Sequence, residues 1–429
     1  MKVLVVGLGI SGVSSAKLLK RFGNKVSVYD DNKETLNKFK EYSLYDEREA
    51  YQMAVVSPGI PSNHAVVQKL RREGVEVIGE MELAGRYLNS ETVIAVTGTN
   101  GKSTTVSLIH SFLKEAGCNS FLCGNIGEPV SNGVNKGYDF LVIEVSSFQL
   151  ETLQSIHPDV AVILNVSPDH LDRYSSYEHY LLTKAELAKL VKPSGIVVLN
   201  GADETLIAAC VTVKVRRKYF SAKGTDDISF RGGNIYVGNS ELKIDNIPLK
   251  GLHNVENIMA AILAVEPYVD DINCIRQALE KFNPLPHRAE FVGKIGEVSF
   301  IDDSKGTNVG ATEMSLSGFE DGEVVLILGG VDKGGSYEPL RVLAEKKCKG
   351  VVLIGEAKSE IKRYFEGFEG VVEASSMKEA VEKSFYLAQN KGVVLFSPAC
   401  SSYDWYNNFI ERGVDFRDKI NELKRELAK

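Results

Sequence analysis

The sequence has no long apolar run, no closely spaced cysteine pair and no surplus of basic residues. No apolar stretch approaches the length of a membrane-spanning helix, so we expect no membrane span. The six cysteines are scattered without a C-x-x-C pair, which predicts reduced thiols and excludes a disulfide framework or a zinc site of that type. A net charge of −7 without a local basic run argues against a nucleic-acid-binding surface. The start of the chain lacks the charged region and cleavage site of a secretory signal, so we expect a cytoplasmic protein.

The composition is typical of a globular protein, and the chain is long enough for more than one hydrophobic core. The chain has 429 residues, of which 44% are apolar and 25% charged, and this length predicts two or three domains. Apolar strand-like segments alternate with helix-like segments, a pattern that predicts parallel sheets with right-handed crossovers. Residues 214–245 alternate and carry many turn residues, which predicts antiparallel strands, and residues 415–429 predict a charged helix. We predict an α/β protein of three domains, at residues 1–89, 90–284 and 285–429, with the two prolines near residue 285 at the second boundary.

The most informative motif is TGTNGKST at residues 97–104. It lies between an apolar strand-like run (92–96) and a helix-like segment (104–116), as a phosphate-binding loop does. In such a loop Lys102 supplies a charge and the Ser103 hydroxyl can hold Mg²⁺. The first glycine of the standard GxxxxGK[ST] pattern is missing, because position 96 is Val. The alternative is a glycine turn that binds nothing.

A second glycine motif, GLGISG at residues 7–12, lies between a strand-like and a helix-like segment. Asp30 ends the next apolar strand, so the pair fits a dinucleotide fingerprint with Asp30 as a ribose acceptor. Read alone it predicts NAD, although any nucleoside diphosphate meets the same physical requirements. The other alternative is that the glycines serve only strand–helix packing.

Two further strands of the central region end in polar residues. Glu144 ends the apolar run 140–143, where a Mg²⁺ ligand would lie beside a phosphate loop. Residues 165–173 follow another buried strand and would bring His170 or Asp172 to the same edge. Lys184 lies in a predicted helix (177–190), where an exposed lysine is the ordinary expectation.

The third region carries three polar loops at strand ends, namely residues 302–308, 329–335 and 397–402. We expect them to line one edge of the third sheet, where ligands of α/β proteins bind. Arg288 lies at the boundary before this region and would reach phosphates held by another domain, with an ion pair to Glu290 or a nearby acidic residue as the alternative.

Taken together, these motifs resemble the Mur ligases, the ATP-dependent enzymes that add amino acids to peptidoglycan precursors. The resemblance covers nearly the whole chain and is carried by GLGISG, SPGIP, GTNGKST, GNIG, EVSSFQLE, NVSPDHLDRY, GLHNVEN, LPHRAE, DDSKGTN, LGGVDKGG and SPACSSYDWYNNFIERG. The middle and last regions alone also resemble folylpolyglutamate synthases. SPGIP and the SPACSS…NNFIERG segment favour the branch that adds D-glutamate to UDP-N-acetylmuramoyl-L-alanine. An NAD-binding regulatory protein built on GLGISG is a distant alternative, because it leaves GTNGKST, LPHRAE and DDSKGTN without a role.

The resemblance implies a Rossmann-like UDP-sugar domain (1–89), a P-loop-type ATPase domain (90–284) and a Rossmann-like amino-acid-binding domain (285–429), in a monomer. It implies UDP-substrate contacts at Ile10, Ser11, Asp30, Gly59 and Asn125. It implies ATP contacts at Gly98, Thr99, Asn100, Gly101, Lys102, Ser103, Thr104, Asn257, Arg288 and Asp303. It implies D-glutamate contacts at Thr307, Lys333, Ser402 and Phe409. For two Mg²⁺ ions it implies Ser103, Glu144, His170 and Lys184, the last as a carbamate, and for catalysis Lys102, His170, Lys184 and Arg288.

The implied reaction proceeds through an acyl phosphate and releases ADP. Both reactants are anionic, so cations must neutralise them. One departure from the family pattern concerns the UDP side. Asp30 is followed by Asp31 and Asn32, without a basic residue to assist the diphosphate.

Overall fold

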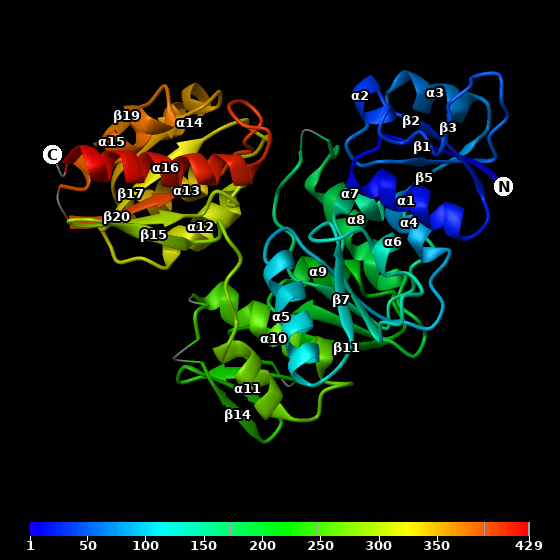
Figure 1. Cartoon of the computed structure of the whole chain (residues 1–429). Coiled ribbons are helices and arrows are strands. Elements are labelled where there is room, and N and C mark those ends of the chain that lie inside the picture. Colours follow the sequence, from blue (N-terminus) through cyan, green and yellow to red (C-terminus); the bar gives the residue numbers. More distant parts are fainter. Residues whose placement is uncertain (172, 226, 245–246, 250, 390, 428–429) are drawn as a thin grey trace. The chain divides into compact units, whose positions relative to one another are not determined.

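The computed structural model describes residues 1–171, 173–225, 227–244, 247–249, 251–389 and 391–427. The chain forms two compact units (Figure 1). The first unit comprises Met1–Val166, Leu181–Ile247 and Asn254–Phe282, and the second comprises Ser167–Tyr180, Pro248–His253 and Asn283–Lys429. No helix of the described residues is both long and apolar enough to cross a bilayer.

The first sheet is parallel and has the order β3-β2-β1-β4-β5. Four of the five residues of β1 are buried, which explains why this strand is a continuous apolar run rather than an alternating one. The strands are β1 Lys2–Val6, β2 Lys25–Tyr29, β3 Ser43–Leu44, β4 Met53–Val56 and β5 Glu76–Gly79. The helices are α1 Ile10–Arg21, α2 Lys33–Leu36, α3 Ala65–Arg72 and α4 Glu80–Gly85.

The second sheet is also parallel, with the order β11-β10-β9-β6-β8-β7. Its strands are β6 Thr92–Thr97, β7 Ser120–Gly124, β8 Phe140–Glu144, β9 Val160–Ile163, β10 Ile196–Asn200 and β11 Arg216–Phe220. The helices of this region are α5 Lys102–Glu115, α6 Val130–Gly133, α7 Ser147–Leu150, α8 Tyr177–Lys189, α9 Glu204–Ala209, α10 Leu252–Val265 and α11 Ile272–Glu280.

The prediction of antiparallel strands over residues 214–245 is wrong for its first part. β11 pairs in parallel with β10 at the edge of the second sheet. The antiparallel part is a separate small sheet of β12 Ser229–Arg231, β13 Asn234–Val237 and β14 Ser240–Lys243. Asp245 lies outside the described residues.

The third sheet has the order β15-β16-β20-β17-β18-β19, and only β15 is antiparallel to its neighbour. Its strands are β15 Glu290–Ile295, β16 Glu297–Asp302, β17 Val324–Gly329, β18 Cys348–Ile354, β19 Val371–Glu373 and β20 Lys391–Phe396. Its helices are α12 Val309–Ser317, α13 Glu338–Lys347, α14 Lys358–Tyr364, α15 Met377–Leu387 and α16 Phe409–Leu427. The predicted helix at 415–429 therefore begins earlier, at Phe409, and its last two residues lie outside the described chain.

Both faces of the third sheet are buried. Along β17, Val325 and Ile327 face a core with α15 and α16, whereas Val324, Leu326 and Leu328 face a core with α12, α13 and α14 (Figure 1). The strands β16, β20 and β17 are parallel neighbours, so their carboxyl ends lie at one edge. The three polar loops at residues 302–308, 397–402 and 329–335 follow these ends, as the sequence predicts.

Candidate active site

The TGTNGKST loop follows β6 and opens α5, and its glycines are required by its geometry. Gly98 and Gly101 have φ of +154° and +85°, in a region that L side chains avoid. A Cβ on Gly101 would lie 2.3 Å from the Asn257 side-chain oxygen, so GLHNVEN lies against the loop. Asn165, after β9, holds the loop through its backbone oxygen to Thr99 N–H (2.8 Å) and through its side chain to Asn100 N–H (2.9 Å). Strand, loop and helix form a rigid cradle of the kind that binds phosphate.

Two lysines reach this loop from different helices. Lys102 donates from Nζ to the carbonyl oxygens of Gly98 (2.8 Å) and Thr99 (2.9 Å). Lys184, on α8, donates to the same Gly98 oxygen at 2.9 Å. Lys184 is only 1% exposed, so the expectation of an ordinary surface lysine is wrong. Its burial against the loop comes from a contact 86 positions away in sequence.

Glu144 ends β8, directly beside β6 in the sheet, and is 2% exposed. Asn125 donates to it twice, from Nδ2 to Oε1 at 2.7 Å and from the backbone N–H to the carbonyl oxygen at 2.9 Å. Among the described residues, the buried Oε2 has no hydrogen-bond partner. A buried carboxylate oxygen without a donor is unfavourable unless a cation satisfies it. A carboxylate oxygen is the kind of ligand that Mg²⁺ prefers, and Ser103, the other predicted oxygen ligand from this region, lies at the start of α5.

His170 belongs to the second unit. It has a positive φ of +57°, and its Nε2 lies 3.7 Å from the buried carboxylate of Asp169. Asp172, the alternative candidate from this segment, lies outside the described residues.

The GLGISG turn is held by close backbone packing. A Cβ on Gly12 would lie 1.8 Å from the Gly7 carbonyl oxygen, and the Ser57 hydroxyl of the SPGIP loop, which also contains Gly59, donates to that oxygen at 2.8 Å. Asp30 accepts the Leu8 N–H at 2.7 Å and the Asn32 N–H at 2.9 Å. Asp30 therefore shapes the turn, a role that the fingerprint does not specify.

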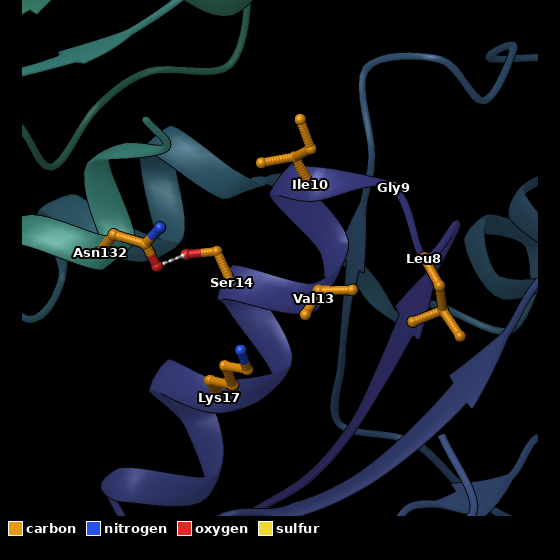
Figure 2. Close-up of a pocket in the computed structure, with 7 residues that line it drawn as sticks. All are labelled: Leu8, Gly9, Ile10, Val13, Ser14, Lys17 and Asn132. Atoms are coloured by element: carbon orange, nitrogen blue, oxygen red, sulfur yellow. Dashed lines mark hydrogen bonds between the residues drawn. The ribbon is translucent and has the colours of Figure 1, made fainter. Parts of the chain in front are cut away.

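A cavity of about 470 Å³ adjoins this turn (Figure 2). Its wall includes Ile10, a predicted UDP-substrate contact, and Asn132, to which Ser14 donates at 2.5 Å. Lys17 also lines the cavity and was not a sequence candidate. Its helical spacing from Ile10 and Ser14 along α1 is the signal that could have identified it. Lys17 therefore places a positive charge at the wall of this cavity.

In the third region, Asp303 is buried and accepts from the hydroxyls of Ser315 and Ser397 at 2.6 Å each and from Ala289 N–H at 3.1 Å. Burial raises the pKa of Asp303 to about 6, and these hydrogen bonds and the charge of Arg288 partly oppose the increase. The structure thus brings Asp303 and the Arg288 loop together.

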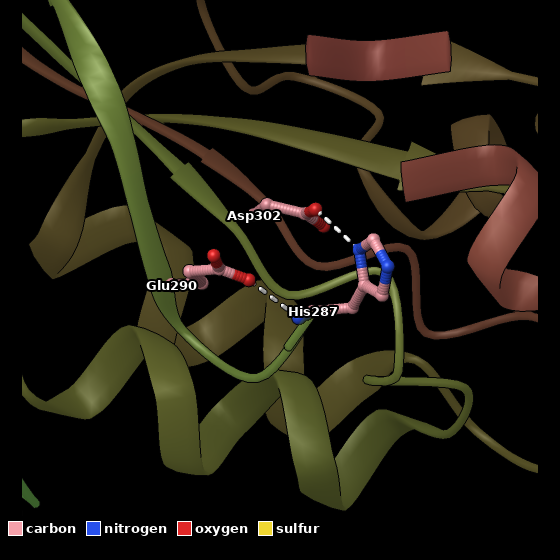
Figure 3. A group of neighbouring side chains, drawn as sticks. All are labelled: His287, Glu290 and Asp302. Carbon is pink, nitrogen blue, oxygen red and sulfur yellow. Dashed lines mark hydrogen bonds and ion pairs between the residues drawn. The ribbon is translucent and has the colours of Figure 1, made fainter. Parts of the chain in front are cut away.

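Next to them, His287, Glu290 and Asp302 form a cluster (Figure 3). His287 Nδ1 lies 2.7 Å from Asp302, and Glu290 accepts the His287 backbone N–H at 2.8 Å. Arg417 forms ion pairs with both carboxylates. Because a guanidinium already neutralises them, the cluster is a fold-stabilising network rather than a metal site. Glu290, which the sequence offered as an ion-pair partner for Arg288, thus forms an ion pair with Arg417.

The structure brings together only some of the residues that the sequence predicts to contact D-glutamate. Lys333 Nζ lies 3.4 Å from Thr307 Oγ1 and 3.5 Å from Asp169 Oδ1. Lys333 and Asp169 line a cavity of about 180 Å³, whereas Thr307 is not among its lining residues. Ser402 and Phe409 are not among the residues that line this cavity. Ser402 is buried in the neighbouring loop.

Phe409 begins α16 beside that loop. Its carbonyl oxygen accepts the Ser304 hydroxyl at 2.8 Å, and the Lys305 amine lies 4.1 Å from its ring centre. Sequence reasoning missed Arg412, which is 1% exposed and donates to the carbonyl oxygens of Ser304 (2.9 Å) and Cys400 (3.1 Å), joining two of the three loops.

Comparison with known proteins gives a consistent result. Residues 1–79 match the Mur ligase MurD-like N-terminal domain, residues 96–265 the Mur ligase middle domain, and residues 287–400 the Mur ligase glutamate ligase domain. The chain is similar to the UDP-N-acetylmuramoylalanine–D-glutamate ligase of Caldicellulosiruptor saccharolyticus, with 37% identity over 98% of this chain and 99% of the relative. The protein of the same name from Geobacter sp. strain M21 is 38% identical over 100% and 99%. The UDP-N-acetylmuramate–alanine ligase MurC of Thermotoga maritima shares the fold, with a TM-score of 0.64 at 18% identity over 98% and 99%.

Proposed function

Because the chain belongs to the Mur ligase family, we propose that it is an ATP-dependent, ADP-forming ligase that joins D-glutamate to UDP-N-acetylmuramoyl-L-alanine in peptidoglycan precursor synthesis. The observation that carries this proposal is the phosphate cradle of residues 97–104, with the unsatisfied Glu144 oxygen on the adjacent strand. The choice of D-glutamate is supported by the name that the relatives share over nearly their whole length.

We assign one substrate to each of the three domains, which correspond to the three main sheets. We propose domains at 1–89 for the UDP-sugar, 90–284 for ATP and 285–429 for the amino acid, since each main sheet is built within one of these segments. Ile10, Ser11, Asp30, Gly59 and Asn125 would bind the UDP substrate, supported by the cavity beside Ile10. Residues 98–104 and Asn257, Arg288 and Asp303 would bind ATP.

Two Mg²⁺ ions would be held by Ser103, Glu144, His170 and a carbamate on Lys184. Bound there, Mg²⁺ would neutralise phosphate charge. Support for this set is the oxygen of Glu144 that lacks a donor and the burial of Lys184 at the loop.

The chemistry assigned to the protein's own residues is positioning and charge compensation. The substrate carboxylate attacks the γ-phosphorus of ATP, and the bond to the β-phosphate oxygen breaks, giving an acyl phosphate and ADP. Lys102 and Arg288 reduce the repulsion between these anions. The D-glutamate amine then attacks the acyl carbon, forming the amide and releasing phosphate. Lys333, Thr307, Ser402 and Phe409 hold the D-glutamate, supported by the contact between the first two.

We propose that the protein works in the cytoplasm as a monomer. All six cysteines are free, as expected for a reducing compartment.

One coupled assay tests the function. ADP release should require UDP-N-acetylmuramoyl-L-alanine and D-glutamate together, and mass spectrometry should find the amide product. L-glutamate and a folate substrate serve as matched alternatives, and NADH fluorescence tests the nucleotide-regulator alternative. ADP release with a folate substrate, or NADH binding without ligation, would overturn the proposal.

A further inference from the structure

Tyr337 is buried between two of the three loops of the third sheet and is 2% exposed. It directly precedes α13, and its hydroxyl donates to Asp332 Oδ1 at 2.6 Å and lies 3.1 Å from Cys400 Sγ. Burial is the main cause that raises the pKa of the Tyr337 phenol, and burial also raises the pKa of the Cys400 thiol to about 12. Both groups keep their protons at neutral pH. The thiol can therefore donate to the phenol oxygen while the phenol donates to Asp332.

The loops that Tyr337 joins are already paired through their backbones. Val331 N–H donates to the Ser401 carbonyl oxygen at 2.9 Å, and Ser401 N–H donates to that of Val331 at 3.0 Å. Ser402 directly follows Ser401, and Lys333 lies two residues after Val331. Both are proposed contacts of the amino-acid substrate. Tyr337 therefore fixes side chains at the point where two substrate loops meet.

The Tyr337 hydroxyl affects how the charges of Asp332 and Lys333 are arranged. Asp332 and Lys333 are adjacent, yet in the described part of the chain they form no ion pair with each other. The Asp332 carboxylate is directed to Tyr337, whereas Lys333 is directed to Thr307 and Asp169. A released Asp332 carboxylate would compete with an anionic substrate for the Lys333 ammonium.

We propose that Tyr337 is a positioning residue for the amino-acid substrate. Its hydroxyl holds the Asp332 carboxylate away from the Lys333 ammonium, which lies 3.5 Å from Asp169, and so removes one competitor of the substrate carboxylate. This rests on the proposed function, in which Lys333 binds a carboxylate of D-glutamate. Tyr337 itself touches no reacting atom. Its effect is on affinity for one of three substrates.

The first test is Tyr337→Phe, which removes the hydroxyl and keeps the ring. KM for D-glutamate should rise about tenfold, the usual effect of losing a charge-assisted hydrogen bond in a site. The value of kcat, the KM values for ATP and the UDP substrate, and Tm should change little. Tyr386→Phe is the matched control, because that tyrosine is 66% exposed on α15. An unchanged KM for D-glutamate in Tyr337→Phe would overturn the proposal.

A second variant separates this role from simple packing. Asp332→Asn keeps the shape of the side chain but cannot neutralise Lys333. In the double variant Tyr337→Phe/Asp332→Asn, KM for D-glutamate should return to within about twofold of the Asp332→Asn value, since the competing charge is gone. If the double variant keeps the full increase of Tyr337→Phe, the hydroxyl acts only as a structural contact and the proposal is wrong.

Lys333→Ala distinguishes failure of this proposal from failure of the proposed site. It should raise KM for D-glutamate by about 10- to 150-fold, the range for a charge-assisted contact. If it does not, Lys333 is not the carboxylate anchor, and both assignments fail. If it does while Tyr337→Phe has no effect, Lys333 keeps its role and only the role of Tyr337 is refuted.

Discussion

Lys102 and Lys184 donate to one and the same carbonyl oxygen, that of Gly98, at distances of 2.8 and 2.9 Å. Two ammonium groups on one oxygen repel each other. Lys184 is 1% exposed, so water screens this repulsion poorly. A carbamate on Lys184 would replace one positive charge by a negative one while its N–H could still donate to Gly98. The proposed carbamate would thus relieve the repulsion between the two side chains.

Lys184→Ala is expected to remove most activity, because a carboxylate near bound Mg²⁺ is lost. Acetate or formate at high concentration should restore part of it by entering the vacated space. Lys189→Ala, an exposed position in the same helix, is the matched control. Peptide mass spectrometry under conditions that preserve carbamates should detect the modification. An unmodified amine in active enzyme, together with no rescue, would contradict the assignment.

Lys102→Ala should lower kcat by on the order of a hundredfold or more, about 3 kcal/mol of transition-state stabilisation. Its amine is the cation that the phosphate loop itself supplies. The free energy of unfolding should change little, because the carbonyl oxygens of Gly98 and Thr99 that accept from this lysine can be solvated by water in a ligand-free loop. Lys114→Ala, in the last turn of the same helix, should behave as the wild type. Near-normal turnover of Lys102→Ala would refute its role.

The parallel strands and the loops at their ends could be predicted from the sequence because both carry local signals. The buried parallel strands β8 and β17 contain continuous apolar runs, which end at Glu144 in β8 and at the glycines before Asp332 after β17. Glycines at positive φ, such as Gly101, mark the turns. These features depend on neighbours in the chain, so a motif could locate the phosphate loop and the three loops of the third sheet.

Features set by distant contacts could not be predicted. The β11 sequence RRKYF is three basic residues followed by two aromatic ones, and nothing in it distinguishes a parallel edge strand from an antiparallel strand. The burial of Lys184 depends on Gly98, and the arrangement at Tyr337 on Cys400, 63 positions away. Helical periodicity at Arg412 gives no sign that its guanidinium binds two loops. In each case a residue distant in the sequence determines the burial and contacts of the side chain, and the local sequence pattern does not reveal it.

Glu144→Gln should weaken metal binding without unfolding the protein. The amide can keep the Asn125 contact through its oxygen, while its NH₂ group replaces the carboxylate oxygen that has no partner among the described residues. Half-maximal activity should then require about tenfold or more free Mg²⁺, because losing a metal ligand or a residue that orients one usually weakens metal binding by at least that factor. Titration of ADP release against free Mg²⁺ measures this. An unchanged Mg²⁺ requirement would show that Glu144 is not a ligand.

The buried carboxyl of Asp303 predicts a specific pH dependence of stability. Its pKa is raised from 3.8 to about 6, mainly by burial, so ionisation of the folded protein is disfavoured. As pH falls through 6 toward 4, the folded protein takes up a proton there, whereas the unfolded chain does so only near 3.8. This group therefore destabilises the fold above pH 6, and that destabilisation is relieved as pH falls through this window.

Asp303→Asn has no such proton, and its amide can still accept from Ala289 N–H while the two serine hydroxyls turn to accept from it. Relative to the variant, the wild type should gain up to about 3 kcal/mol of unfolding free energy between pH 7 and pH 4. Denaturant titrations of both proteins at several pH values measure this difference, and groups common to both cancel. Parallel stability curves across the window would mean that Asp303 is already ionised without penalty in the folded protein.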